Sequence, residues 1–345
     1  MWGAVNNNNT RLVYSNLIIM ADHADDDNFD GDIFIYRGGR APLHVKHVLI
    51  DKSADEIEDG AFGGCKRLVQ VDTHDGIRRV GVDAFSDCTS LRRINLKSAV
   101  EIGLEAFYNC YNLESVEFGD RLEIIGDAAF SRCSSLKTPL KLPPNITIGI
   151  CAFFKCKRLA DIELSERIET IGVRTFFDCE RLQRIAIPLK RDLFEFSNLF
   201  GCYNQFEGCE QLVTVHLVGG THKTVASLHM EGWRTEMTAE INRINQVLPN
   251  TAANEKTGEI QQWMDSVIDK MDHYKAEHCR YVKEGITLLE LALWKANLEE
   301  KEADRLEREG GRLTRRSRKR ARKEINVTSG AGIVIKNVLP FLQLE

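Results

Sequence analysis

Apolar and polar residues recur in a fixed order along the middle of the chain. Between Ala61 and Leu217 an Ala-Phe pair is followed by Cys three residues after the Phe, by Leu three residues later, and then by apolar residues that alternate with polar ones. The cysteines stand at 65, 88, 110, 133, 156, 179 and 209, so the steps are 23, 22, 23, 23, 23 and 30 residues. A fixed period of this length predicts a solenoid of stacked units.

Each repeat combines two kinds of spacing. In Ala129–Leu136 the apolar residues are three or four apart, which predicts a short helical turn with one face directed inward. In Leu113–Phe118 and Leu159–Leu164 they alternate with polar residues, which predicts a short strand with one buried face. Because a single unit cannot bury its own apolar face, the units are expected to stack, strand beside parallel strand, into a curved sheet.

An Ile-Gly step joins these segments, as at Ile125-Gly126 and Ile171-Gly172. Glycine is expected there because it permits a tight change of direction that a Cβ atom would hinder. The full pattern, Ile-Gly-x-x-Ala-Phe-x-x-Cys-x-x-Leu-x-x-Val-x-Leu, resembles the BspA-type class of the leucine-rich-repeat superfamily and covers about half of the chain. The resemblance implies an α/β solenoid with a curved parallel sheet and short helical turns, used as a recognition scaffold, and it brings no shared catalytic residues.

Two units lack the usual alanine, and one has an altered strand. Thr175 and Gln205 stand where the other units have Ala. Pro139 lies near the strand of another unit, so that the apolar pair of that unit shifts to Leu140 and Leu142.

The resemblance also implies which side chains face the concave side, namely the polar positions on either side of the middle strand residue. This row is mixed in charge and contains no triad, no metal-ligand cluster and no paired carboxylates in a recognisable setting. A partner-binding face and an ordinary solvated sheet face therefore both stay open. The candidate contacts are Arg93, Asn95, Glu117, Lys141, Asp161, Glu163, Arg184 and His216.

Seven additional residues precede Cys209, within Leu189–Tyr203. An insertion in a repeat array projects as a loop, often on the binding face. Its aromatic residues either contact a partner or cover the last repeats, and the helical spacing within the segment favours the covering role. The candidate contacts in this loop are Phe194, Phe196 and Phe200.

Seven of the ten cysteines occupy the same point of the repeat. Stacking would place them in a column on one inner edge, where cysteine serves as a small buried hydrophobe. No Cys-x-x-Cys pair exists, which argues against a metal site. The apolar stretch Leu12–Ala21 is interrupted by Ser15 and Asn16, so neither a signal peptide nor a membrane span is expected. Free thiols in a reducing, intracellular compartment are therefore expected instead of disulfides or metal ligands.

The start of the chain is expected to be a disordered acidic arm, with translation beginning at Met1 or at Met20. Asp26–Arg37 begins like a calcium-binding EF-hand loop, but its twelfth position is Arg37, where a bidentate Glu is required. Ile33–Tyr36 and Val45–Ile50 are expected to form a strand and the first unit, which cap the open end of the solenoid.

Helical spacing replaces the repeats towards the C-terminus. Met237–Leu248 predicts one helix closed by Pro249, and Ile260–Tyr281 predicts a second, whose apolar seam steps alternately by four and three residues. Gly285 is expected to end the second helix, so that Ile286–Leu298 forms a third helix. The helices are expected to make an antiparallel hairpin or a three-helix bundle. Structural roles are expected for the potential metal ligands, which lack a fourth partner and a metal-site spacing. These residues are His273, His278 and Cys279.

Residues 312–323 carry eight cations and no acid, so this segment cannot fold on itself. It predicts a nuclear-localisation signal recognised by an import carrier, loose binding to nucleic acid or anionic membrane, or a solvated linker. No aromatic residues interleave with the cations, which argues against base stacking. The candidate tract comprises Arg315, Arg316, Arg318, Lys319, Arg320, Arg322 and Lys323.

The sequence therefore predicts five segments. These are an acidic arm (1–32), a capped solenoid (33–220), a helical module (221–305), a basic linker (306–326) and an apolar tail (327–345). The tail is too apolar to stay in water and is expected to dock on the helical module.

Three classes of function follow. The first is a non-enzymatic scaffold or adaptor that binds a protein partner through the concave face and the helical module. The second is a nuclear regulatory protein that contacts nucleic acid weakly through the basic tract. The third is an enzyme, for which no constellation meets the geometric roles that catalysis needs. No cofactor, metal or small-molecule substrate is expected, and the predicted location is nuclear or nucleocytoplasmic.

Overall fold

The computed structural model describes residues 33–137, 139–196, 204–219, 225–228 and 230–309. Contacts divide the chain into two compact units, of which unit 1 comprises Met1–Thr221 with Asn242–Asp265, and unit 2 comprises His222–Ile241 with Ser266–Glu345. The boundaries drawn from the sequence assign 242–265 to the helical module, whereas this division places them with the repeats. The acidic arm, the basic tract, the apolar tail and Phe200 lie outside the described residues.

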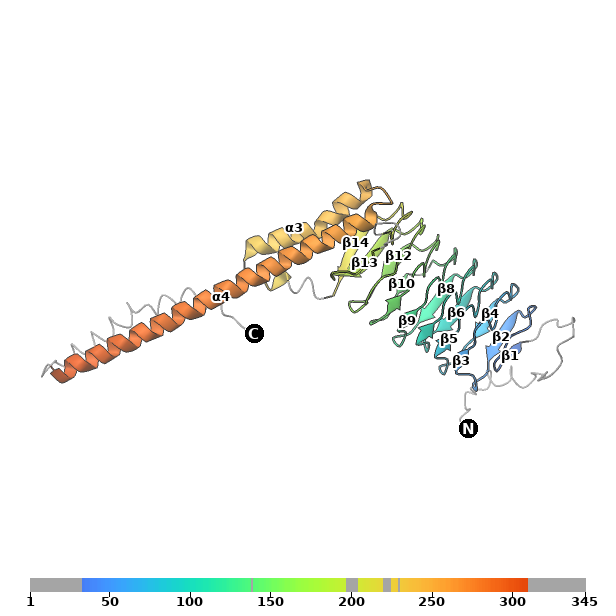
Figure 1. Ribbon diagram of the computed structural model, residues 1–345, viewed down its shortest axis with the longest axis horizontal. Helices are drawn as coiled ribbons and strands as arrows, with labels where there is room; N and C mark the ends of the chain where they lie inside the picture. Colours follow the sequence, from blue (N-terminus) through green and yellow to red (C-terminus); the bar gives the residue numbers. More distant parts are fainter. Residues whose placement is uncertain (1–32, 138, 197–203, 220–224, 229, 310–345) are drawn as a thin grey trace, which may run out of the picture. The chain divides into compact units, whose positions relative to one another are not determined.

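Unit 1 is a solenoid in which parallel strands stack along the array in chain order (Figure 1), as the repeat predicts. The strands on the predicted concave side form two sheets, in the orders β1-β2-β4-β6-β8 and β10-β12-β13-β14. The fold class predicted from the sequence is confirmed. These strands are β1 (Phe34–Tyr36), β2 (His47–Ile50), β4 (Gln70–Asp72), β6 (Arg93–Leu96), β8 (Ser115–Phe118), β10 (Leu140–Lys141), β12 (Asp161–Glu163), β13 (Arg184–Pro188) and β14 (Thr214–Val218).

A third sheet, which the sequence pattern does not predict, runs along the Ile-Gly steps in the order β11-β9-β7-β5-β3. Its strands have only two residues each, too few to show an alternating pattern. They are β3 (Glu56–Ile57), β5 (Arg79–Val80), β7 (Glu101–Ile102), β9 (Ile124–Ile125) and β11 (Thr147–Ile148).

The Ala-Phe-x-x-Cys segments are successions of hydrogen-bonded turns where the spacing predicts short helical turns. The amide of Cys133 donates to the carbonyl of Phe130 at 3.2 Å, three residues back, and the same bond recurs in the other repeats. The residue before the cysteine has a positive φ, as at Arg132 with 63° and Asp87 with 59°, so the right-handed helical path ends at that point.

One phenylalanine from each repeat forms a continuous column in the core. Successive rings are stacked with centroids 5.0 to 5.7 Å apart, and each ring is fully buried. Tyr36 closes the column at its N-terminal end, 4.9 Å from the ring of Phe62. The column comprises Phe62, Phe85, Phe107, Phe130, Phe153, Phe176 and Phe206.

The seven repeat cysteines are buried and free, as predicted. From Cys88 to Cys209 each thiol also donates to the carbonyl of the phenylalanine in the preceding repeat at 3.0 to 3.3 Å, a bond that the sequence does not predict. Burial raises the pKa of Cys65 to about 11 and that of Cys209 to about 12. These thiols are thus protonated at neutral pH and act as packing groups with one directed hydrogen bond.

The glycines of the Ile-Gly steps are required for a different reason from the one predicted. Their φ angles are not positive, so no unusual turn needs them. A Cβ atom on Gly126 would lie 2.8 Å from the carbonyl carbon of Gly103 and from the amide nitrogen of Leu104. Glycine is therefore needed because the backbones of neighbouring repeats approach each other closely at this step.

The concave side is divided between β8 and β10. Pro139 precedes β10 and has no amide N–H to donate, so the ladder that continues through the other repeats is interrupted there. The apolar pair of this repeat is nevertheless buried as predicted, with Leu140 at 2% and Leu142 at 5% exposure.

Residues of 242–265 cap the last repeat. Asn245 lies in α3 (Glu231–Val247), and its side chain accepts from the amide of Val215 at 2.7 Å and donates to the carbonyl of Val215 at 3.0 Å. Thr257 Oγ1 accepts from the amide of Phe206 at 2.9 Å, a bond that the carbonyl of the next repeat provides elsewhere. These side chains satisfy backbone groups of β14 and of the last turn segment, so the array ends without a missing partner at these positions.

The buried ammonium of Lys256 completes this cap. It is 2% exposed and donates to the carbonyls of Cys209, Glu210 and Leu212 at 3.0, 2.7 and 2.7 Å. Desolvation lowers the pKa of Lys256, while the three carbonyl dipoles supply the hydrogen bonds that the charge loses with its water.

After η1 (Leu248–Asn250), α4 (Lys256–Glu309) runs without a break. The prediction that Pro249 closes the first helix is confirmed, whereas the prediction of an interruption at Gly285 and a separate third helix is wrong. A single glycine costs a helix only about 1 kcal/mol, which the neighbouring leucines and alanines tolerate.

Within unit 2, α3 and α4 form an antiparallel pair. Ser266 donates to Glu240 at 3.0 Å, Tyr274 donates to Glu236, and the ring of Trp233 stacks on Tyr274 at 5.0 Å. The predicted seam is buried as far as Tyr274, but Tyr281 is 49% exposed. Both apolar packing and polar pairing therefore hold the first part of α4 against α3.

Candidate functional site

All eight candidate residues belong to strands of the two sheets on the concave side, and each side chain is exposed or half-buried. The register brings Asn95 opposite Glu117, Lys141 opposite Glu163, and Asp161 opposite Arg184. His216 lies opposite Ala186, which carries no charge. Glu117 and Lys141 are not paired, because the sheet is divided between their strands.

Several charged side chains of this face neutralise each other. Arg184 holds Asp161 through two guanidinium nitrogens, with Nε–Oδ1 at 2.8 Å. Lys141 pairs with Glu163 at 3.0 Å, and Lys97 pairs with Glu117 at 2.7 Å. Such solvent-exposed pairs contribute little stability, but they leave less net charge for a partner.

Arg92 and Arg93 differ from these residues. Both are exposed, and neither forms an ion pair with any carboxylate in the part of the chain that the structure describes. The nearby Glu114 is already bound by Lys137 at 2.8 Å. The pKa of Glu114 lies below its usual value, first through the Lys137 hydrogen bond and then through the charges of Arg92 and Arg93. The result is a local excess of positive charge at the start of β6, which we call the arginine patch (Arg92 and Arg93). The sequence pattern identifies Arg93 but not Arg92, which precedes the strand and therefore falls outside the alternation.

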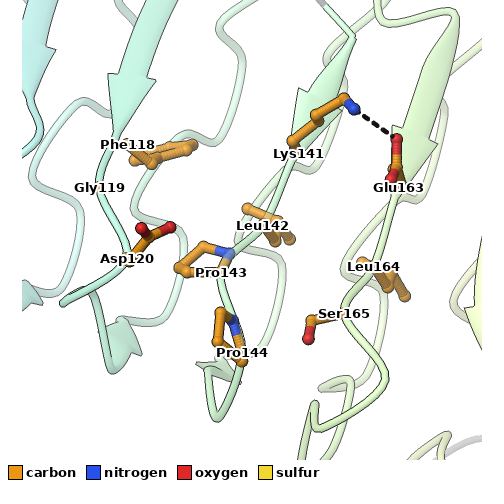
Figure 2. A pocket seen from close by; sticks show the side chains of 10 residues that line it. All are labelled: Phe118, Gly119, Asp120, Lys141, Leu142, Pro143, Pro144, Glu163, Leu164 and Ser165. Carbon is orange, nitrogen blue, oxygen red and sulfur yellow. Dashed lines mark ion pairs between the residues drawn. The ribbon is translucent and has the colours of Figure 1, made fainter. Parts of the chain in front are cut away.

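A shallow pocket of about 350 Å³ lies beyond the carboxyl ends of β8, β10 and β12 (Figure 2). Phe118, Leu142, Pro143 and Leu164 give it apolar walls, and Lys141 and Glu163 face each other across its rim, joined by their ion pair. The residues that line it include no histidine, cysteine or arginine. The pocket can receive an apolar side chain, but its lining offers no nucleophile with an adjacent base.

The structure places the aromatic residues of the insertion differently from one another. Phe194 is 2% exposed and packs edge-on against Phe206 at 5.4 Å. Its backbone bridges to Ile171, which itself bridges to Ile148 of β11, so Phe194 continues the line of the third sheet. Phe194 therefore covers the last repeat, and it has no surface left for a partner. Phe196 is half exposed, at 48%.

The described residues contain no group of three or more His, Cys, Asp and Glu side chains arranged to hold a metal ion. None of the described helices carries an apolar stretch of the length and purity needed to cross a bilayer.

The stacked turns, the phenylalanine column and the parallel sheets define a leucine-rich-repeat solenoid. The chain matches the family described as BspA type leucine rich repeat region in six copies, over residues 42–147 and 138–227, and it belongs to this family. Proteins built from such repeats are generally scaffolds without catalytic activity.

Similar solved structures are leucine-rich-repeat proteins from bacteria. One is the T. pallidum leucine rich repeat protein, at 28% identity over 53% of this chain and 73% of that chain, with a TM-score of 0.37. Others come from Bacteroides ovatus (24% identity, 50% of this chain and 61% of that one, TM-score 0.30) and from Faecalibacterium prausnitzii, a cell surface protein (22% identity, 51% and 60%, TM-score 0.29). A search among curated proteins found no match.

Proposed function

We propose that this protein is a protein-binding scaffold, and that its concave face holds an acidic segment of the partner at the arginine patch. The observation that carries the proposal is that Arg92 and Arg93 are exposed without an ion pair among the described residues, whereas Lys97, Lys141 and Arg184 on the same side are each paired with a carboxylate.

The chemistry of arginine supports an acidic partner. A guanidinium group presents a rigid fork of donors that matches a carboxylate in two parallel hydrogen bonds, and it is less strongly hydrated than an ammonium group. Two adjacent cations beside an already neutralised Glu114 attract an acidic segment during association and hold it afterwards. Arginine is also among the residues that most often dominate interface energies.

The pocket beyond β8 extends this surface. In the register of the sheet, Arg93 lies opposite Ser115 of β8, and Phe118, where the pocket begins, stands three residues further along that strand. With about 3.3 Å per residue and about 4.8 Å between strands, the two places are about 11 Å apart. An extended partner segment with acidic residues near an apolar residue would contact both places.

Binding of a fluorescein-labelled peptide of fifteen glutamates, measured by fluorescence anisotropy, tests the arginine patch. The measurement uses a background in which Arg315, Arg316, Arg318, Lys319, Arg320, Arg322 and Lys323 are glutamine, because the basic tract would otherwise bind the peptide itself. The parent protein, with this background and otherwise wild-type sequence, is expected to bind the peptide with an affinity that falls as salt rises, because exposed charges are screened. The double variant Arg92→Glu and Arg93→Glu is expected to weaken binding by about tenfold or more, since two attractions become repulsions worth about 1.4 kcal/mol or more together.

The matched control is the double variant Arg158→Glu and Arg181→Glu. It makes the same change of net charge at two other exposed arginines of unit 1. Its affinity for the peptide is expected to stay within about twofold of that of the parent protein, because these charges lie away from the arginine patch and are screened. Equal losses in both double variants would show that net charge alone governs binding and would overturn the assignment to the arginine patch, as would a parent protein that does not bind the peptide.

A second proposal concerns location, because residues 312–323 combine eight cations with no acid. We propose that the tract directs the protein to the nucleus through an import carrier. Replacing Arg318, Lys319 and Arg320 by Ala is expected to abolish nuclear accumulation of a tagged protein in a nucleated cell, while much of any weak DNA retention stays. Exclusion of the wild-type protein from the nucleus would remove this proposal. Strong DNA binding that falls in proportion to each cation removed would favour direct nucleic-acid binding instead.

A further inference from the structure

The last third of α4 presents large apolar side chains to solvent. Between residues 286 and 298 six of them are 43% to 64% exposed, whereas Ile260, Met264 and Val267 earlier in the same helix are fully buried. Leu288, Leu291, Trp294 and Leu298 follow one face at steps of three, three and four residues, whereas Ile286 and Leu293 lie on the opposite side of the helix. We call Leu288, Leu291, Trp294 and Leu298 the distal apolar surface.

The described partner of α4 does not reach this surface. The antiparallel pairing proceeds from Glu240 beside Ser266 to Trp233 beside Tyr274 and Tyr281, and α3 begins at Glu231. In Figure 1, α4 continues well past the start of α3. Exposed apolar surface of this extent on a polar helix indicates an interaction site.

We propose that residues 333–344 of this same chain fold back and pack on the distal apolar surface. This segment, Ile-Val-Ile-Lys-Asn-Val-Leu-Pro-Phe-Leu-Gln-Leu, has apolar side chains at eight of its twelve positions besides the proline. Burial of such residues against leucines is favourable by about 25 cal/mol for each Å² removed from water.

The length of the intervening chain fits this arrangement. Gly310 and Gly311 directly follow α4, and a glycine pair is a common helix stop and turn. From Glu309 back to Leu288 is 21 residues, about 32 Å of helix. From Gly311 forward to Ile333 is 22 residues, so the connecting chain spans the same distance even with a rise of only 1.5 Å per residue.

Charge favours this occupant over an unrelated apolar one. Residues 299–309 contain six acids and three bases, and the returning chain between the glycine pair and the tail carries the eight cations of 312–323. If the chain after the glycine pair runs back antiparallel to α4, the cations lie beside the acidic residues 299–309 and the tail lies beside the distal apolar surface. The charge attraction and the apolar packing then favour the same alignment of the two segments. In this arrangement the basic tract becomes available to a carrier when the tail leaves α4.

The test is crosslinking in the full chain with a short bismaleimide reagent, in a background where the exposed Cys279 is serine. The pair Leu288→Cys with Ile335→Cys is expected to form an intramolecular link about tenfold faster than the pair Leu293→Cys with Ile335→Cys. Leu293 serves as the matched control because it is similarly exposed, five residues further along α4, on the opposite side of the helix from the distal apolar surface.

Adding Leu339→Asp and Phe341→Asp to the first pair is expected to reduce its rate to that of the control, because the charges cannot be buried on leucines. Hydrogen exchange of the full chain supplies the second measurement, with protected amides expected in 333–344. Equal crosslinking of both pairs, or exchange of these amides at the rate of an unstructured peptide, would overturn the proposal. Links formed mainly between two molecules would show that a second copy covers the surface and would also overturn it.

Discussion

Replacement of Gly126 by alanine is expected to destabilise the repeat array by about 3 kcal/mol, an effect at the upper end of those caused by overpacking. The added Cβ would lie 2.8 Å from two backbone atoms of the preceding repeat, the carbonyl carbon of Gly103 and the amide nitrogen of Leu104. Backbone atoms cannot rotate away as a flexible side chain could, so the two repeats must separate and lose the packing between them. The urea midpoint followed by circular dichroism measures the loss.

Gly232→Ala serves as the control for this substitution. No heavy atom lies within 4 Å of the Cβ position at Gly232, and the residue belongs to α3, where alanine is favoured over glycine by up to about 1 kcal/mol. This variant is expected to be at least as stable as the wild type. If the urea midpoint of Gly126→Ala were unchanged, close approach of neighbouring backbones would not be the reason that the Ile-Gly steps need glycine.

Replacement of Lys256 by methionine is expected to cost about 3 kcal/mol, with the loss concentrated in the last repeat. The substitution keeps an unbranched side chain that is one heavy atom shorter, but it removes the ammonium that donates to three buried carbonyls. A hydrogen bond from a charged donor contributes about 1.5–3 kcal/mol, and carbonyls left without a donor add to the loss. Because neighbouring repeats stabilise each other, exchange of backbone amides is expected to rise in 204–218 before it rises near the N-terminal repeats.

Lys275→Met provides the comparison for the lysine, because Lys275 is exposed and its change is expected to alter stability by less than about 0.5 kcal/mol. Thr257→Val, which removes the acceptor for the amide of Phe206, is expected to loosen the same repeat to a smaller degree. Unaltered exchange in residues 204–218 of Lys256→Met would mean that the cap does not stabilise the end of the array.

The core of the repeat could be predicted from the sequence because it repeats. The positions of Phe130, Cys133 and Leu136 recur in every unit, and each is fully buried. The third sheet, along the Ile-Gly steps, could not be predicted, since strands of two residues such as Ile124–Ile125 are too short to show a period. The thiol hydrogen bonds were missed as well, because the carbonyl acceptor of Cys133 belongs to a residue 26 positions earlier.

The C-terminal cap could not be predicted because it depends on contacts across long stretches of sequence. Lys256 binds carbonyls 44 to 47 residues earlier, and Asn245 pairs with Val215 at a separation of 30 residues. In the sequence Lys256 looks like any solvated lysine at the start of a helix. The continuity of α4 through Gly285 was missed for another reason, since a lone glycine is a weak break when strong helix formers surround it.

For the candidate site, alternation within the strands predicted which positions of the row leave the core: Arg93 is exposed and Asp161 is half-buried. It could not tell which charges are neutralised, because the bond between Arg184 and Asp161 depends on the register of two neighbouring strands. Arg92 could not be predicted from the alternation because it stands before its strand, although it shares with Arg93 the absence of an ion pair among the described residues.

The central claim, that the concave face holds an acidic partner segment at the arginine patch, is tested most directly by photo-crosslinking from Asn95. Asn95 is exposed and lies two residues from Arg93 on the same strand, so a photoreactive amino acid there reports what occupies this face in the native cell. Sequencing of the linked peptides is expected to reveal a segment with an acidic run, and the link is expected to disappear in the Arg92→Glu and Arg93→Glu variant. Linked peptides without acidic residues, or links that persist unchanged in that variant, would contradict the account.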